Sequence, residues 1–412
     1  MLTRGWDTIS IVRRDRINRE LQNAWSEKDA HFVDELPGGA GHMEGDFSCW
    51  SIVDGGGGRI LRMKLPIARG TLAIRDGEEI PLEGISAVIE VTLSLIPQQA
   101  ELSLLQTEYK NLANSRQEMT EDKTGWILPV TLIDPEKRTG IYQTVLLDAI
   151  CRYLLSNPQQ FILVFAEINF AKRESPEWAR PKRCAYSYLD SGYLAVLSVC
   201  TNREISGLPL DVDVSGIPIG SSSFYAMSSE LMLKQLILPG LLPLYQNASE
   251  GSYMVSEREM YNRQQLRMQE IKSGAIYYTP VVYEHGNIAR ITGNQIEVTY
   301  RGECDMYAGI TMKWNGSVKM KAVLGSGANI IFCRDGSTFS DDEDIPWYLA
   351  WLLPIVGLIV QIVVAVISDD LIASIESHSG EIKAGNINTV TWCGGQDVVK
   401  AVYLSESLIL EY

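Results

Sequence analysis

The stretch that decides the fold is residues 347–367, WYLAWLLPIVGLIVQIVVAVI, which carries no charged side chain. Thirteen of these 21 residues are Leu, Ile or Val. As a helix the stretch would be about 31 Å long, which matches the hydrocarbon core of a bilayer. It is therefore either a transmembrane helix or a helix buried inside a folded protein, and the surrounding sequence has to distinguish the two.

The flanks of this stretch are acidic on both sides. Residues 341–344 read DDED, and Asp369 and Asp370 follow the stretch. The nearest basic residues are Arg334 and Lys383, so the sequence lacks the cluster of positive charge that usually anchors the cytoplasmic end of a membrane span. The flanks therefore argue against a span.

The apolar face of this helix continues beyond the uncharged stretch. The residues on it are Ile355, Ile359, Ile362, Val366, Leu371, Ile372 and Ile375. A narrow stripe of small or polar residues also keeps helical spacing, namely Gly357, Gln361, Ala365 and Ser368. Such a helix is expected inside a protein as well as inside lipid. The pattern favours a long helix over about 347–377, covered by protein, with membrane insertion of residues 347–367 as the alternative.

Residues 296–333 give the clearest strand signal in the chain. In ITMKWNGSVKMKAV, which begins at Ile310, apolar and polar residues alternate on both sides of Asn315-Gly316. Because Asn-Gly tolerates the positive φ of a type I′ turn, we predict a hairpin turn there. One face of the hairpin would be apolar, and the uncharged helix is the nearest element that could cover it. This predicts curved antiparallel sheet around a helix.

Other segments complete the predicted architecture. Helical spacing of apolar residues predicts an N-terminal helix at about 7–25 and a central helix at about 228–246, which Pro239 and Pro243 should kink or end in stages. Residues 144–157 predict a further helix, and 60–133 are rich in β-branched runs typical of strands. The predicted class is α+β, and we expect a single elongated unit over 1–412.

The composition limits which partners and which cellular compartment are expected for this chain. The chain has 412 residues and a net charge of −15, which disfavours nucleic acid as a partner. Its seven cysteines are scattered, without a CxxC, so we expect neither a disulfide framework nor a zinc cluster. The first 21 residues lack the uninterrupted apolar core of a signal peptide. We therefore expect synthesis in the cytoplasm, while release by another route stays open.

No catalytic or cofactor pattern is present. The four histidines are far apart in sequence, and HExxH, GxSxG and P-loop patterns do not occur. The glycine run at 55–58 lacks the surroundings of a phosphate loop and predicts a turn. The acidic run at 341–344 lacks the spacing of a calcium loop and predicts an exposed linker. We therefore predict no catalytic residues, no metal site and no cofactor.

Four segments resemble, in the same order, a known family. They are GWDTISIVRRDRINREL near the start, GDFSCWSIVDGGGGRILRMKLPIARGTL after it, SSELMLKQLILPGLLPLY in the middle, and TVTWCGGQDVVKAVYLSESLILEY at the end. This order is similar to the 47-kDa accessory proteins of clostridial toxin gene clusters and to the related OrfX proteins. Gly5-Trp6-Asp7 with Asn18, and Gly45 with Trp50, are the most specific pieces.

The resemblance implies a TULIP (tubular lipid-binding) architecture, in which strongly curved antiparallel sheet wraps long helices. It implies a non-enzymatic protein that assists a neurotoxin or an insecticidal toxin and is released with it. The expected partners are a lipid or another apolar ligand, sister proteins of the cluster, and a membrane surface. The residues expected to line a lipid groove are Trp351, Leu352, Val356, Ile359, Val363, Leu231 and Ile237. A membrane-anchored protein and a scaffold without lipid are the alternatives.

Overall fold

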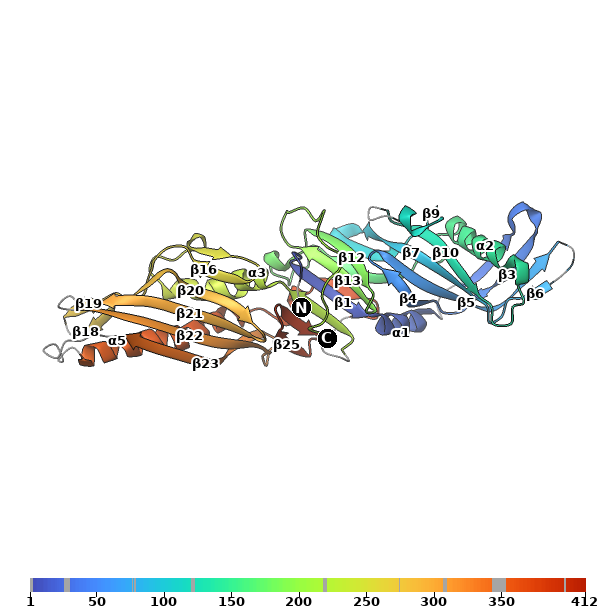
Figure 1. The fold of residues 1–412 in the computed structure, drawn as a ribbon. Coiled ribbons are helices and arrows are strands. Elements are labelled where there is room, and N and C mark those ends of the chain that lie inside the picture. Colours follow the sequence, from blue (N-terminus) through green and yellow to red (C-terminus); the bar gives the residue numbers. More distant parts are fainter. Residues whose placement is uncertain are drawn as a thin grey trace.

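The computed structural model describes residues 3–25, 30–75, 77, 79–119, 123–217, 221–273, 275–306, 310–342, 353–395 and 398–412. The molecule is elongated, and both chain ends lie near its middle (Figure 1). Three large sheets follow one another along its length, each built almost entirely from antiparallel strand pairs. The described part of the chain is thus mostly antiparallel sheet with few helices.

The central sheet has six strands and joins the beginning, the middle and the end of the chain. In spatial order the strands are β12 (Arg183–Leu189), β13 (Tyr193–Val199), β1 (Thr8–Arg13), β14 (Ser223–Met227), β26 (Leu408–Glu411) and β25 (Ala401–Leu404). The hairpin of β12 and β13 turns at residues 190–192, and both strands are almost completely buried.

The predicted N-terminal helix over 7–25 is wrong in its first half. Residues Thr8–Arg13 form strand β1, and helix α1 occupies Arg14–Trp25. Strand β1 pairs on both edges, with β13 and β14, and residues 8–12 are buried. Thr8, Ile9, Ser10 and Ile11 alternate polar and apolar residues as a strand does, but Trp6 and Ile9 also lie at roughly helical spacing from Ile17, and this extended the predicted helix over the strand.

The second sheet has eleven strands. Its main path is β2 (His31–Glu35), β3 (Gly41–Phe47), β5 (Ile60–Ile74), β7 (Ser86–Pro97), β8 (Leu102–Thr107), β11 (Val164–Asn169) and β24 (Val390–Trp392). Beside this path lie β4 (Ser51–Gly57), β6 (Glu79–Pro81), β9 (Asn111–Leu112) and β10 (Trp126–Ile133). Helix α2 (Gln143–Ser156) packs on it, as residues 144–157 predicted.

The third sheet has seven strands. They are β15 (Tyr253–Val255), β16 (Glu259–Asn262), β17 (Leu266–Arg267), β20 (Val281–Thr292), β21 (Gln295–Asp305), β22 (Thr311–Leu324) and β23 (Ile330–Asp342). A separate hairpin of β18 (Ile271–Ser273) and β19 (Ile276–Tyr278) lies near one tip of the molecule (Figure 1).

The predicted hairpin turn at Asn315-Gly316 is wrong. Both residues lie inside the continuous strand β22, where Gly316 pairs with Tyr300 on one side and Phe339 on the other. Gly316 faces the core, and a Cβ there would lie 3.0 Å from the backbone oxygen of Thr338 and 3.3 Å from the ring of Phe339. The glycine therefore lies close to the neighbouring strand on a buried sheet face, and it does not reverse the chain.

Helices cover the inner face of the third sheet. The central helical run consists of α3 (Ser229–Met232), a π-helical segment (Leu233–Ile237), α4 (Leu238–Leu241) and a 3₁₀ turn (Leu242–Leu244). The C-terminal run consists of α5 (Leu353–Ala365), a π-helical segment (Val366–Asp370) and α6 (Leu371–Ser379), followed by α7 (Ala384–Ile387). Of the helix predicted at 347–377, residues 347–352 lie outside the described residues.

Three hydrophobic cores stabilise these layers. The largest, here called the helix core, combines the helices from α3 to α7 with the inward residues of the third sheet. The second core lies between the eleven-stranded sheet, α1 and α2, and a small third core lies on the central sheet. The C-terminal segment contributes to all three, with Ile387 in the first, Trp392 in the second and Ile409 in the third.

Candidate functional site

Helix α5 has a buried apolar inner face and an outer face without charged residues. On its inner face Val356, Ile359 and Val363 are at most 3% exposed and belong to the helix core. Leu231 and Ile237, on the central helical run, are buried in the same core. Five of the seven residues predicted to line a groove are thus brought together, while Trp351 and Leu352 lie outside the described residues.

The outer face of α5 carries no charge. Gly357 and Gln361 are exposed, and Leu358 is partly exposed and lies outside the set of side chains packed on the helix core. A helix that lies between a core and water normally has charged residues on its outer side. From Leu353 to Ala365 there is no Asp, Glu, Lys or Arg, so this face is uncharged where a charged face would be usual, and Gln361 is an exposed polar side chain on it.

Within the described ranges, no helix has the length and hydropathy that a membrane span requires.

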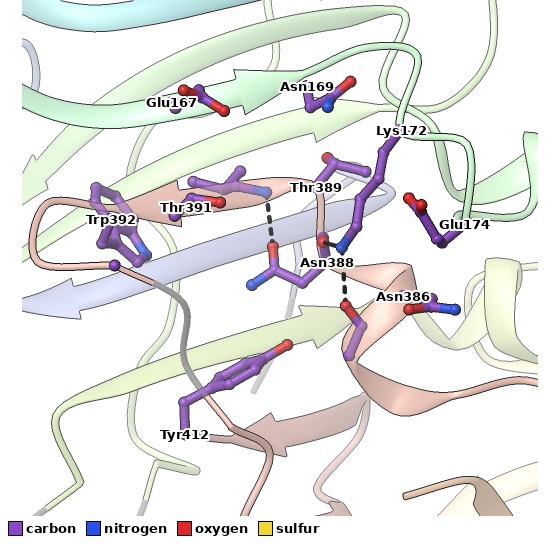
Figure 2. A pocket seen from close by; sticks show the side chains of 13 residues that line it. Glu167, Asn169, Lys172, Glu174, Asn386, Asn388, Thr389, Thr391, Trp392 and Tyr412 are labelled. Atoms are coloured by element: carbon purple, nitrogen blue, oxygen red, sulfur yellow. Dashed lines mark hydrogen bonds between the residues drawn. The ribbon is translucent and has the colours of Figure 1, made fainter.

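A polar cavity of about 480 Å³, here called the junction cavity, lies where the C-terminal segment crosses from α7 to β24 (Figure 2). The residues lining it are Glu167, Asn169, Lys172, Glu174, Gly385, Asn386, Asn388, Thr389, Val390, Thr391, Trp392, Gly395 and Tyr412. They come from β11 and the loop after it, from α7, from β24 and the residues beside it, and from the residue after β26. No predicted site residue is among them, although residues 389–395 and Tyr412 lie in the C-terminal segment quoted above for its resemblance.

Lys172 ties two of these segments together. Its Nζ donates to the backbone carbonyl of Gly385 over 3.0 Å and to that of Asn388 over 2.9 Å. Burial lowers the pKa of this lysine, and the nearby Glu174 carboxylate partly offsets that effect. The ammonium group is therefore held by carbonyl oxygens at the edge of the cavity, and it positions the segment that enters β24.

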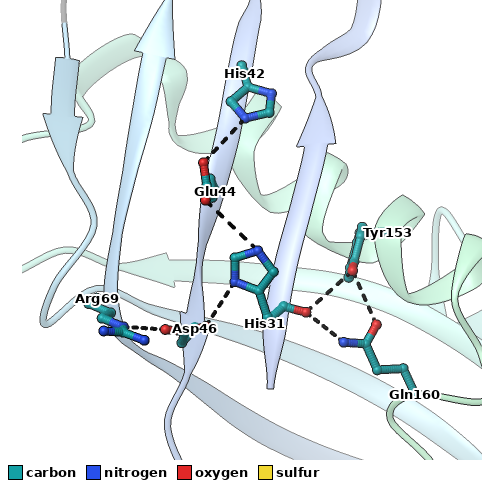
Figure 3. A network of polar contacts seen from close by, with 7 residues as sticks. All are labelled: His31, His42, Glu44, Asp46, Arg69, Tyr153 and Gln160. Atoms are coloured by element: carbon teal, nitrogen blue, oxygen red, sulfur yellow. Dashed lines mark hydrogen bonds and ion pairs between the residues drawn. The ribbon is translucent and has the colours of Figure 1, made fainter. Parts of the chain in front are cut away.

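A polar network covers the outer face of the sheet formed by β2, β3 and β5 (Figure 3). His31 Nδ1 lies 3.0 Å from Asp46 Oδ1, and Arg69 also bonds Asp46. His42 Nδ1 lies 3.3 Å from a Glu35 carboxylate oxygen, and Glu44 lies 3.9 Å from each histidine. Hydrogen bonds from Arg69 and His31 lower the pKa of Asp46.

This network shows what sequence spacing missed. His31 and His42 are eleven positions apart with Gly38, Gly39 and Gly41 between them, which is the spacing of a hairpin that places both on one face. Among the described residues no group of three or more His, Cys, Asp or Glu side chains is arranged to hold a metal ion. The network therefore joins β2, β3 and β5 through charge and hydrogen bonds.

Of the glycine run at 55–58, the first three residues end strand β4 and Gly58 leads to β5, so the predicted turn lies only at the end of the run. Tyr188 donates its backbone N–H to the carbonyl of Gly58 over 2.6 Å, and Arg116 donates to the carbonyl of Gly55. In the acidic run, Asp341 and Asp342 end β23, and residues 343–344 lie outside the described residues.

Comparison with known proteins identifies relatives over most of the chain. Residues 3–394 match the OrfX-like family, described as "Protein OrfX2/OrfX3/P47". Protein P47 of Clostridium botulinum (strain Kyoto / Type A2) is 24% identical over 313 residues, which are 73% of this chain and 72% of that protein. Protein OrfX3 of Paraclostridium bifermentans is 22% identical over 285 residues, or 61% of this chain and 57% of that protein.

Solved structures share the fold over nearly the full length. P47 from Clostridium botulinum A2 superposes with a TM-score of 0.74 at 20% identity, covering 99% of this chain and 97% of that one. P47 of Clostridium botulinum E1 gives a TM-score of 0.71 at 20% identity, covering 99% and 98%. These superpositions show the shared fold. The family match over residues 3–394 shows that the chain belongs to the OrfX2/OrfX3/P47 family of toxin-cluster accessory proteins.

Proposed function

We propose that this protein serves its toxin system by binding lipid, without catalysing a reaction, through helix α5 and the sheet that covers it. In this proposal the third sheet and the helices form a TULIP-type lipid-binding unit. Val356, Ile359, Val363, Leu231 and Ile237 form its inner lining. Family membership supports the accessory role, and the surface of α5 supports the lipid part.

The observation that carries the proposal is the uncharged outer face of α5. Leaving Leu358 and its neighbours in water forfeits about 25 cal/mol for each Å² of apolar surface that stays exposed. The interfacial region of a bilayer would cover this surface, with acyl chains against Leu358 and with headgroups or water as hydrogen-bond partners of the Gln361 amide. A protein partner would also cover it, and this is the scaffold alternative.

Lysine at Leu358 should weaken binding to phospholipid vesicles by about 10- to 100-fold, because a buried leucine contributes about 1.5–3 kcal/mol. Leu358 lies outside the helix core, so Leu358→Lys should leave the fold intact. Co-sedimentation with vesicles of phosphatidylcholine and phosphatidylglycerol measures the binding, and circular dichroism checks the fold.

Two controls separate surface contact from core damage. Ala373→Lys adds the same charge at an exposed position of α6 and should bind vesicles like the parent protein. Val363→Lys places the charge in the helix core and should unfold it. If Leu358→Lys binds vesicles as well as the parent, or if the parent binds none and carries no lipid in native mass spectrometry, the lipid proposal is rejected and a protein partner gains support.

A further inference from the structure

We propose that the junction cavity binds a neutral, polyhydroxylated molecule of the size of a sugar unit. The cavity lies away from α5, so this proposal does not rest on the proposed lipid function. It rests on the donors and acceptors that line the cavity, on their balance of charge, and on the two aromatic rings beside it (Figure 2).

Two asparagine side chains present fixed donors at the cavity. The backbone N–H of Ala171 donates to Asn169 Oδ1 over 3.0 Å, and that of Val390 donates to Asn388 Oδ1 over 3.0 Å. These bonds define which end of each amide is oxygen. Each Nδ2 group is therefore turned away from its backbone partner, and hydroxyl oxygens are the acceptors it could bind.

The charges of the lining disfavour ionic ligands. Glu167 and Glu174 repel an anion such as a phosphate, and Lys172 is the one cationic side chain in the described lining. The carbonyl oxygens of Gly385 and Asn388, which could hold a cation, already accept from Lys172. The two carboxylates remain as acceptors for O–H donors. A neutral molecule that both donates and accepts fits this balance, whereas an apolar one would leave these groups unpaired.

Aromatic rings flank the polar wall. Figure 2 shows Trp392 on one side of Asn388 and Tyr412 facing it from below. Trp392 is fixed by an indole N–H bond to Ser10 Oγ at 3.2 Å, and both rings are at least nine-tenths buried. Because Trp392 and Tyr412 are 3% and 5% exposed, a bound sugar would touch only a small part of each residue, and its hydroxyls would bind chiefly the amides and carboxylates.

A second hollow continues past Lys172. It has a volume of about 570 Å³ and is lined by Glu101, Leu102, Ala171 and Arg173, sharing Asn169, Lys172 and Glu174 with the junction cavity. Two adjoining hollows that share Asn169, Lys172 and Glu174 have room for two linked sugar units. We therefore expect a disaccharide to bind more tightly than either of its monosaccharides.

Saturation-transfer NMR on the full chain tests this with glucose, galactose, mannose, N-acetylglucosamine, lactose and maltose at millimolar concentration. We expect saturable transfer to at least one sugar, reduced about tenfold or more by Glu167→Ala and by Asn386→Ala, since each removes a hydrogen-bonding group from the wall. Glu376→Ala, an exposed change on α6, should leave the transfer unchanged.

The proposal is overturned if no sugar of this set shows transfer, or if transfer persists unchanged in both cavity variants. Displacement of the bound sugar by inorganic phosphate would also overturn it, because it would show an anion site. Vesicle binding by these variants should equal that of the parent protein, so failure of the sugar proposal is distinguishable from failure of the lipid proposal.

Discussion

Replacing Gly240 by valine should push helix α6 away from helix α4 and destabilise the helix core by about 3 kcal/mol or more. A Cβ at Gly240 would lie 2.7 Å from Ile375 Cα and 2.9 Å from its backbone nitrogen. These are main-chain atoms of α6, so rotation of a side chain cannot relieve the contact. The two helices cross at this glycine, and Ile375 is itself completely buried.

Gly357→Ala is the matched control for this substitution. Gly357 lies in α5 of the same C-terminal helical run, and a Cβ there would meet nothing within 4 Å. Alanine should therefore stabilise the protein by about 0.5–1 kcal/mol, as it does in helix interiors. Urea unfolding gives both free energies, and hydrogen exchange over Leu371–Ser379 locates the effect. Protection of α6 that is unchanged in Gly240→Val would contradict the proposed close crossing.

The helices show which features the apolar pattern of a sequence can predict and which it cannot. Apolar spacing predicted the central and C-terminal helical runs, because each packs one face on the helix core. It could not show that the two runs cross at Gly240, since that contact joins segments far apart in the chain. It identified the stripe of Gly357 and Gln361 but could not show that the stripe faces outward, because a helix without charged residues has no strongly polar face by which to orient it.

The sequence of β22 contains a pattern of alternation typical of one continuous strand, but our prediction gave more weight to the Asn-Gly turn motif. In a two-residue hairpin centred on Asn315 and Gly316, Trp314 would face Ser317, and apolar residues would oppose polar ones. The buried residues are instead Met312, Trp314, Gly316, Val318, Met320 and Ala322, all of the same parity. Because the apolar residues occupy every second position on both sides of Asn-Gly without a shift, the pattern indicates one strand. This pattern outweighs the preference of the dipeptide for a turn.

The polar sites could not be predicted because their members are distant in sequence. Lys172 and Asn388, which meet at the junction cavity, are 216 positions apart. The pairing of β11 with β24 brings them together, and neither strand has a pattern that identifies the other as its neighbour. The burial of five of the seven predicted groove residues could be predicted, because buried positions recur with helical spacing in the local sequence. Hydrogen-bonding partners carry no such local signal.

Glu90→Gln should destabilise the eleven-stranded sheet by about 3 kcal/mol, the lower end of the range for breaking a buried ion pair, because both partner arginines can reach water. Glu90 lies on β7 and its side chain is 1% exposed. Arg62 donates to Glu90 Oε1 over 2.7 and 2.9 Å, and Arg116 Nε donates to Oε2 over 2.7 Å. Glutamine keeps the shape, but it removes the charge that compensates two arginines.

The same triad gives a pH dependence whose sign can be derived. Burial alone would raise the pKa of Glu90, but hydrogen bonds and charges from Arg116 and Arg62 outweigh it and hold the pKa below its ordinary value of 4.5. The unfolded chain therefore binds this proton more readily, and the stability from Glu90, complete above that value, is lost as the pH falls through the lower folded pKa.

Urea unfolding of the parent and of Glu90→Gln between pH 3 and pH 7 should show a difference that is largest near neutrality and shrinks below pH 4.5. Glu136→Gln, which removes an exposed carboxylate 3.5 Å from Arg138, should change stability by less than about 1 kcal/mol throughout. A constant difference across this pH range would mean that the ionised carboxylate of Glu90 does not hold β7, β5 and the segment around Arg116 together. A difference in unfolding free energy that becomes smaller on acidification would show that the buried charge of Glu90 holds these segments together. An apolar side chain would be the usual residue at such a buried position.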